Sequence, residues 1–147
     1  MNEALECNTY ISIIDNAPDA ILYCDSAGII HLWNKGAEHL FGYSAAEAIG
    51  QTLDIIIPER MRQRHWEGYF RVMETGKSHY GDYDLLSVPA LRKDGSQFSC
   101  AFSIILLRDA GGKPQGIASI MRVGTKTRER EQELKARIAA LEAELDK

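Results

Sequence analysis

The sequence lacks the features that mark membrane, secreted and nucleic-acid-binding proteins. Its longest apolar stretches, such as SIILL, are far too short to cross a bilayer, and the N-terminal MNEALECN has no apolar segment of a secretory signal. The net charge is -4, so the chain has no basic excess with which to bind nucleic acid. We therefore predict a cytoplasmic domain with no nucleic-acid partner and no membrane segment of its own. A membrane anchor elsewhere in a longer parent protein stays open.

Cysteine is also scarce. The three cysteines, Cys7, Cys24 and Cys100, are far apart and form no CxxC pair, which argues against a zinc site and fits a reducing compartment. The order of the residues suggests no Ser/His/Asp or Cys/His set, and kinase and cyclase motifs are missing. We therefore predict a module that is not an enzyme.

What the chain does contain is a series of short periodic segments within 147 residues, enough for one domain with an appendage. Residues 2–15 have apolar residues at helical spacing, and AILYCDSAGIIHLWN predicts a β-hairpin with its glycine in the turn. Ser44 and Glu47 have the spacing of a capping box at the start of a short helix. Residues 60–74 predict a longer helix, and three strands separated by RKDGS and DAGGKP follow.

The C-terminal segment TKTREREQELKARIAALEAELDK has neither glycine nor proline. Its apolar residues step by 4, 3 and 4, which is the a/d spacing of a coiled coil: Leu134, Ile138, Leu141 and Leu145. Because the seam covers only about two heptads, we predict that it pairs into a homodimer with help from the adjoining domain. A solvated single helix is the alternative that the sequence leaves open.

Three stretches together resemble a PAS domain: NAPDAILYCDSAGIIHLWNKGAEHLFGYSAAEAIGQ, IIPERMRQRHWEGYFRVMETG and RKDGSQFSCAFSI. The resemblance implies an α+β fold, with a five-stranded antiparallel sheet, short helices on one face and a ligand pocket between them. It also implies a sensory and dimerisation module that passes a pocket signal through a coiled coil to an output domain of the histidine kinase, diguanylate cyclase or chemoreceptor type. On this basis we divide the chain into an N-terminal flanking helix (1–15), a PAS sensor domain (16–124) and a coiled-coil signalling helix (125–147).

The chain departs from the family pattern where the last strand meets the exit helix. PAS domains often carry D-[IV]-T there, whereas this chain has RVGT, with Val123 at the position of the aspartate and Gly124 after it. Thr125 matches the family pattern. The departure predicts a junction that is more flexible or that transmits the signal differently.

At about 100° per residue, the predicted helix over residues 60–74 has a polar arc and an apolar arc. His65 lies near the centre of the apolar arc, which also holds Tyr69, Trp66 and Phe70. An inward histidine either forms a hydrogen bond in the core or holds a ligand, and the hydrogen-bonded core histidine is the commoner case. Trp66 is expected to pack rather than to bind a ligand.

The segment RQRHWEGY is similar to the axial-histidine segment of oxygen-sensing FixL-type haem PAS domains, with Trp66 as a one-residue insertion. This resemblance implies haem b with His65 as the axial iron ligand, the alternative to a haem-free sensor. The distal arginine of the FixL type maps near Leu86, so the distal side would be apolar, lined by Leu86, Phe102 and Ile104. Such a side would favour CO or NO over oxygen. Against haem, Phe102 stands where a porphyrin needs space.

We predict that the ligand pocket is lined by residues of this helix and of the strands that follow: Met61, His65, Tyr69, Val72, Leu86, Cys100, Phe102, Ile104 and Ile120. The ligand is left open between haem b, another apolar or aromatic small molecule, and none. Flavin is less favoured, because the chain has no GxNCRFLQ run with a reactive cysteine; non-covalent FAD stays open.

Overall fold

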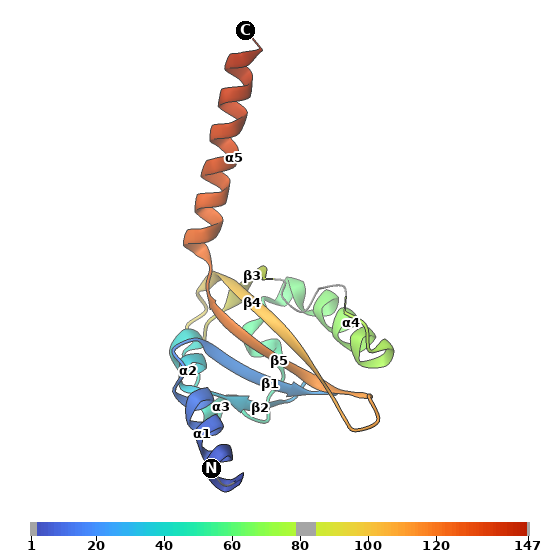
Figure 1. The fold of residues 1–147 in the computed structure, drawn as a ribbon. Helices are drawn as coiled ribbons and strands as arrows, with labels where there is room; N and C mark the ends of the chain where they lie inside the picture. Colours follow the sequence, from blue (N-terminus) through green and yellow to red (C-terminus); the bar gives the residue numbers. More distant parts are fainter. Residues whose placement is uncertain (1–2, 79–84, 147) are drawn as a thin grey trace.

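The computed structural model describes residues 3–78 and 85–146. These residues form the helices α1 (Glu3–Asn16), α2 (Lys35–Phe41), α3 (Ala45–Ala48), η1 (Leu53–Ile56), α4 (Glu59–Thr75) and α5 (Thr125–Leu145). They form the strands β1 (Ala20–Asp25), β2 (Ile30–Trp33), β3 (Leu86–Leu91), β4 (Gln97–Arg108) and β5 (Pro114–Val123). The order of elements is the predicted one, from an entry helix through a hairpin and a longer helix to three strands and an exit helix (Figure 1).

The strands form one antiparallel sheet in the order β2-β1-β5-β4-β3, so the first and the last strand of the domain lie side by side. Helices α2 and α4 pack against the sheet, and α3 packs against β2. In Figure 1 no helix crosses in front of β4 and β5, and that side of the sheet is open. The predicted α+β architecture, a five-stranded antiparallel sheet with helices on one face, is confirmed.

Local sequence signals explain where several elements begin and turn. Ser44 and Glu47 form the predicted capping box of α3: the Ser44 hydroxyl accepts the Glu47 N–H, and the Glu47 carboxylate accepts the Ser44 N–H. Gly28 closes the turn between β1 and β2 at φ 83°, a backbone conformation that favours glycine. The predicted hairpin is therefore confirmed.

Side chains alternate across each strand, so the sheet has an inner face toward the helices and an outer face. On β5 the inner residues Ile117, Ser119 and Met121 are buried, whereas Ile120 is 38% exposed. The prediction that Ile120 lines the pocket is therefore wrong, because the register pairs it with Ser103 on the outer face. The segment GIASIM carries apolar residues on both faces, so alternation in the sequence did not identify the inner one.

The inner side of the sheet is packed unevenly. The packed half comprises β1, β2, α2 and α3, and its apolar side chains are almost fully covered: Ala20, Leu22, Cys24, Ile30, Trp33, Ala37, Phe41 and Ala48. The α4 half comprises α4, β3 and β4, and most of its apolar side chains are only half-buried: Met61, Val72, Met73, Leu86, Phe98, Phe102, Ile104 and Leu106. Among the described side chains of α4 itself, Tyr69 alone is fully buried.

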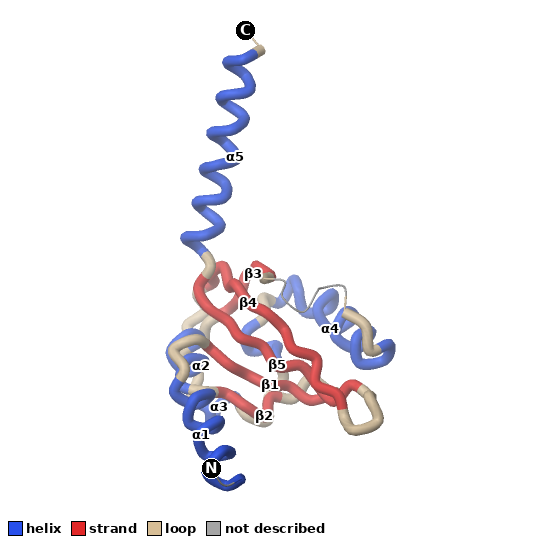
Figure 2. The backbone as a smooth tube through the Cα atoms, in the orientation of Figure 1, coloured by secondary structure: helices blue, strands red, loops and turns tan. Residues whose placement is uncertain are grey.

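The flanking helices lie outside this core. Tyr10, Ile11 and Ile13 of α1 are each 62% exposed. Figures 1 and 2 show α5 projecting from the end of β5, away from the sheet. The division at residues 15 and 124 stays a prediction, as does the pairing of α5. Within residues 3–78 and 85–146, no helix has the length and apolar content needed to cross a membrane.

Candidate functional site

The centre of α4 is held on the β1–β2 turn by two aromatic side chains. The Tyr69 hydroxyl lies 2.6 Å from the carbonyl oxygen of Asp25 and 3.3 Å from that of Cys24, and donates to them. Burial raises the pKa of Tyr69, so it stays a phenol and a donor. The indole N–H of Trp66 donates to the Asp54 carboxylate at 2.7 Å.

Trp66 also fixes the identity of residue 28. Its ring lies over Gly28 so closely that a Cβ at that position would stand 2.3 Å from the indole. Because Gly28 also has a positive φ, the turn needs glycine for both reasons. The prediction that Trp66 packs rather than binds a ligand agrees with these contacts.

The C-terminal end of α4 is held by a side chain from β4. No basic residue lies in the last turn of α4, whose carbonyl groups carry partial negative charge. Arg108 supplies the charge instead: its guanidinium donates to the carbonyl oxygen of Gly76 at 2.6 Å and to that of Gly112 at 3.2 Å. The centre and the C-terminal end of α4 are thus fixed by polar contacts, while its apolar side is loosely covered.

His65 lies next to Trp66, one helical turn before Tyr69 and on the same side of α4. Its ring centre is 4.6 Å from that of Trp66 and 5.9 Å from that of Tyr69. Its Nδ1 is buried and has no hydrogen-bond partner among the described residues. Burial lowers the pKa of His65, so the imidazole is neutral at physiological pH. The alternative of a hydrogen-bonded core histidine therefore finds no partner for Nδ1 among the described residues.

Most of the predicted pocket residues lie on the inner side of the α4 half. Register pairs Leu86 with Phe102 and Ile104 with Ser119, so these cross-strand neighbours share a face. Cys100 lies on the same face of β4 and is fully buried, and burial raises its pKa to about 11, as expected for a packed thiol. Met61 and Val72 are half-buried on α4.

Two sequence expectations about this site fail. The helical periodicity predicts Phe70 on the inward arc of α4, but its side chain is 47% exposed and stacks on Trp66 with the rings 5.6 Å apart. Ile120 points outward, and the inner residue of that part of β5 is Ser119, which is only 6% exposed. Sequence reasoning missed Ser119 because it assigned the wrong face of β5 to the core. A serine flanked by apolar residues is the signal that it could have used.

No arginine stands in for the distal arginine of the FixL type among the described residues of β3. The nearest one along the chain, Arg92, is engaged elsewhere: its Nε donates to the carbonyl oxygen of Leu40, and its guanidinium lies 4.1 Å from the centre of the Phe98 ring. The side chains of Leu86, Phe102 and Ile104 offer no hydrogen-bond donor. The inner face of the α4 half is therefore mainly apolar.

These residues fit a haem group. An axial ligand must present a neutral imidazole nitrogen, and His65 has a lowered pKa and one buried, unpaired nitrogen. A porphyrin also needs apolar surroundings, which the half-buried Leu86, Phe102 and Ile104 offer. Within the described residues, no cluster of three or more His, Cys, Asp or Glu side chains is placed to hold a metal ion by itself.

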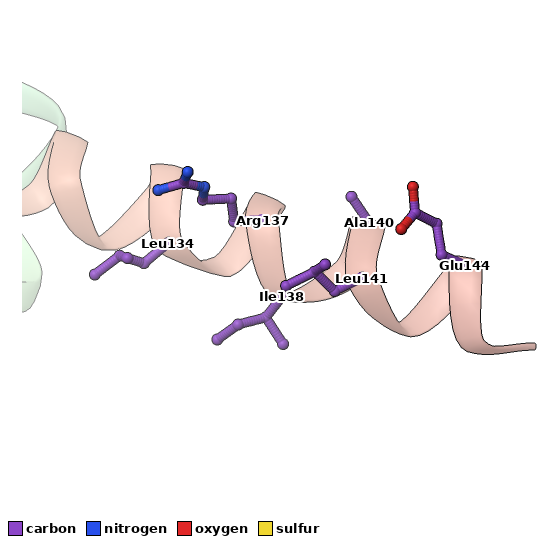
Figure 3. Close-up of a pocket in the computed structure, with 6 residues that line it drawn as sticks. All are labelled: Leu134, Arg137, Ile138, Ala140, Leu141 and Glu144. Carbon is purple, nitrogen blue, oxygen red and sulfur yellow. The ribbon is translucent and has the colours of Figure 1, made fainter.

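The predicted seam of α5 is uncovered along its length. The exposed fractions of its residues are 50% at Leu134, 55% at Ile138, 60% at Leu141 and 84% at Leu145. Figure 3 shows Leu134 and Ile138 on one side of the helix, Arg137 and Glu144 on the opposite side, and Leu141 between them. An apolar stripe bordered by charges is therefore present on α5.

Comparison with known proteins gives a consistent result. The family model described as "PAS fold" matches residues 14–129. The sensor protein FixL of Bradyrhizobium diazoefficiens is 36% identical over 134 residues, which make up 91% of this chain and 25% of that protein. The oxygen sensor protein DosP of Escherichia coli is 27% identical over 129 residues, 88% of this chain and 15% of that protein. The chain thus spans a quarter or less of the length of these two relatives.

Among solved structures, the PAS domain of a protein from Colwellia psychrerythraea superposes with a TM-score of 0.70 at 25% sequence identity. The match covers 82% of this chain and 98% of that one. The fold of the described residues is therefore that of a known PAS domain. The α4 half and the flanking helices are the parts whose function the fold alone does not define.

Proposed function

The chain belongs to the PAS family, as its sequence predicts, and from this premise we propose that it is a sensor. We propose further that it senses a gas or a redox change through haem b held by His65. A sensory role in signal transduction fits its relatives, a sensor protein and an oxygen sensor protein. The chain is a sensor module that needs no catalytic residues of its own. A histidine kinase, diguanylate cyclase or chemoreceptor output would then lie elsewhere in a longer protein.

The observation that carries the haem proposal is the buried, unpaired Nδ1 of His65. A buried polar atom without a partner costs free energy, so natural proteins rarely keep one without a use for it. The lowered pKa of the imidazole favours the neutral form that a metal requires. His65 also belongs to α4, the helix whose centre and C-terminal end are fixed by polar contacts while its apolar side is loosely covered.

His65 would hold the iron, and Leu86, Phe102 and Ile104 would surround the porphyrin. Bound haem would supply an iron centre that accepts a diatomic gas or changes its oxidation state. The apolar side chains of β3 and β4 exclude water and give a polar gas little hydrogen-bonding help. We therefore expect a preference for CO or NO over oxygen relative to a sensor that has an arginine there.

Titration of the purified protein with haemin tests this proposal. We expect a sharpened Soret band in the wild type and a loss of affinity of about tenfold or more in His65→Ala, because the axial bond is removed. His39→Ala is the matched control, since His39 is exposed on α2 and lies in the packed half. A wild type that binds no haemin, or a His65→Ala variant with an unchanged spectrum, contradicts the proposal. Mass spectrometry of small molecules extracted from the protein would then identify another ligand.

We propose further that α5 pairs with α5 of a second copy as a parallel coiled coil. With Leu134 and Leu141 at d positions and Ile138 and Leu145 at a positions, Arg137 falls at g and Glu142 at the following e position. In a parallel pair these two residues of opposite charge face each other across the interface. The exposed seam and this charge pattern support the pairing, and the short length favours help from the domain.

Disulfide trapping tests the pairing. In a Cys7→Ser background, Leu141→Cys is expected to form a crosslinked dimer on mild oxidation, because d positions of a parallel pair meet. Ala143→Cys, two residues further along and on the outer side of the helix, is the matched control and should remain uncrosslinked. Equal crosslinking at both positions, or a monomer in sedimentation, contradicts the paired helix.

A further inference from the structure

One ion pair joins the entry of the domain to its exit. The guanidinium of Arg122, near the end of β5, lies 2.6 Å from the carboxylate of Asp19. Asp19 lies between α1 and β1, and Arg122 precedes the start of α5. The two residues are 103 positions apart in the sequence, so the contact exists only because β1 and β5 are neighbours in the sheet.

The Asp19 side of this contact is tied by hydrogen bonds to the end of α1. The amide of the buried Asn34 donates to the carbonyl oxygen of Ile14, in the last turn of α1, at 2.8 Å and to that of Asp19 at 3.0 Å. Its Oδ1 accepts the N–H of Ile21 at 2.8 Å. Gly36 approaches so closely that a Cβ there would stand 2.1 Å from the Asp19 carbonyl oxygen. The last turn of α1 and the backbone of Asp19 therefore share one hydrogen-bond partner, Asn34.

The Arg122 side is connected to α5 through a tight junction. The N–H of Gly124 donates to the carbonyl oxygen of Ser99 at 2.8 Å. A Cβ on Gly124 would stand 2.9 Å from that of Ala101, so the chain rests directly on β4 at this point. Val123 is 50% exposed and carries no charge with which to anchor the junction. The charged contact lies one residue earlier, at Arg122.

We propose that the Asp19–Arg122 pair couples the position of α1 to that of α5, in place of the aspartate that the family pattern has at position 123. The coupling lies within one chain and needs neither haem nor a second copy, so it is independent of the proposed ligand. The pair is accessible, with 31% of the Asp19 and 66% of the Arg122 side chain exposed. It therefore contributes little to folding stability and acts on the geometry of the exit helix.

The distance between two spin labels, one on each flanking helix, measures this coupling. Cys7 on α1 is exposed and can be labelled, and Arg130→Cys adds a second site on α5. Cys24 and Cys100 are buried, which raises their pKa to about 12 and about 11 and keeps them unreactive. Labelled chains are diluted with unlabelled protein, so that pulsed electron resonance measures distances within one chain.

We expect Asp19→Asn and Arg122→Gln each to broaden the distance distribution by about twofold, and the charge reversal Asp19→Arg with Arg122→Asp to narrow it again. About 1 M salt should broaden the wild type but not the single variants. Lys93→Gln, which breaks the exposed Lys93–Glu47 pair elsewhere on the surface, is the matched control and should change nothing. Unchanged widths in both single variants, a reversal that stays broad, or equal broadening in the control would overturn the proposal.

Discussion

The packed half and the α4 half of the domain share one sheet but differ in how completely they are built. In the packed half Phe41, Ile30 and Ala37 have no exposed surface, and the buried amide of Asn34 has partners for both its oxygen and its nitrogen. In the α4 half the apolar side chains are mostly half-buried, and the buried imidazole nitrogen of His65 has no partner among the described residues. The buried polar side chain of the first half is thus fully paired, whereas that of the second half is not.

The difference separates the half that provides the core from the half in which we propose that the ligand binds. A helix fixed at its centre by Tyr69 and Trp66 and at its C-terminal end by Arg108 keeps its place even though its apolar side is loosely covered. Displacement of such a helix by a ligand need not unfold the domain, because the packed half provides the core. The proposed sensing therefore depends on incomplete packing in one half of the inner side of the sheet, next to a half that is closed.

The largest expected effect is a loss of core packing in the packed half. Phe41→Ala should lower the free energy of unfolding by about 3–5 kcal/mol, because the ring is fully buried between Trp33 and Phe98. Phe70→Ala in the α4 half, where the ring is 47% exposed, should cost less than about 1 kcal/mol. Urea denaturation followed by circular dichroism measures both. Similar costs for the two would mean that the halves are equally packed.

At Phe102 we expect a smaller loss of stability, together with tighter binding of haemin. Phe102→Ala should cost about 1–2 kcal/mol, less than a buried ring, because the side chain is only half-buried. If Phe102 occupies space that a porphyrin needs, the same variant should bind haemin several-fold more tightly. Ile105→Ala, on the outer face of the same strand, is the matched control and should leave haemin affinity unchanged. Weaker binding by Phe102→Ala would show that the ring contacts the ligand instead of competing with it.

The sequence was sufficient to predict the helices and turns whose signals lie within a few neighbouring residues. The capping box of Ser44 and Glu47 acts over three residues, and the apolar periodicity of α4 is confined to one helix, so both were predictable. The fold itself followed from the combined resemblance of three stretches.

What the sequence could not show depends on contacts between distant residues. Asn34 binds Ile14 and Asp19 because two chain segments meet beside α2, and nothing local in the sequence predicts this. The missing partner of His65 could be recognised only once its neighbours were known. The error at Ile120 arose because β5 is apolar on both faces, and only the pairing with β1 and β4 fixes which face is buried.

The pH dependence of stability gives a finer test of His65. Burial lowers its pKa in the folded state below the unfolded value of about 6.5. Below that pH the unfolded chain binds more protons at this site, so the wild type loses stability as the pH falls from about 6.5 through the folded pKa. Above about 6.5 both states are neutral, and the site contributes nothing to the slope.

The variant His65→Leu should therefore not lose the folding stability that protonation of His65 costs the wild type at acid pH. We expect the difference in unfolding free energy between variant and wild type to be constant from pH 8 to about 6.5 and to favour the variant increasingly below it. Urea unfolding at several pH values measures the difference, and the other histidines cancel because both proteins contain them. Parallel curves down to pH 5 would show that His65 is solvated in the folded state.

The smallest expected effect is at Ser119, where the two halves meet. Its register partners are Leu22 in the packed half and Ile104 in the α4 half, and its side chain is buried among apolar neighbours. A buried hydroxyl in such surroundings costs free energy unless something bonds to it, so Ser119→Ala should raise the unfolding free energy by about 0.5–1 kcal/mol in the ligand-free protein.

The matched control is Ser103→Ala, on the outer face of β4, which should change stability by less than about 0.5 kcal/mol in either direction. If Ser119 is retained because its hydroxyl meets a polar group of the ligand, the stability gain of Ser119→Ala should disappear or reverse once the ligand is bound. A loss of stability already in the ligand-free protein would mean that the hydroxyl is satisfied within the fold. In that case Ser119 would belong with the fully paired residues of the packed half, and the loosely packed half would begin at its β4 neighbour Ile104.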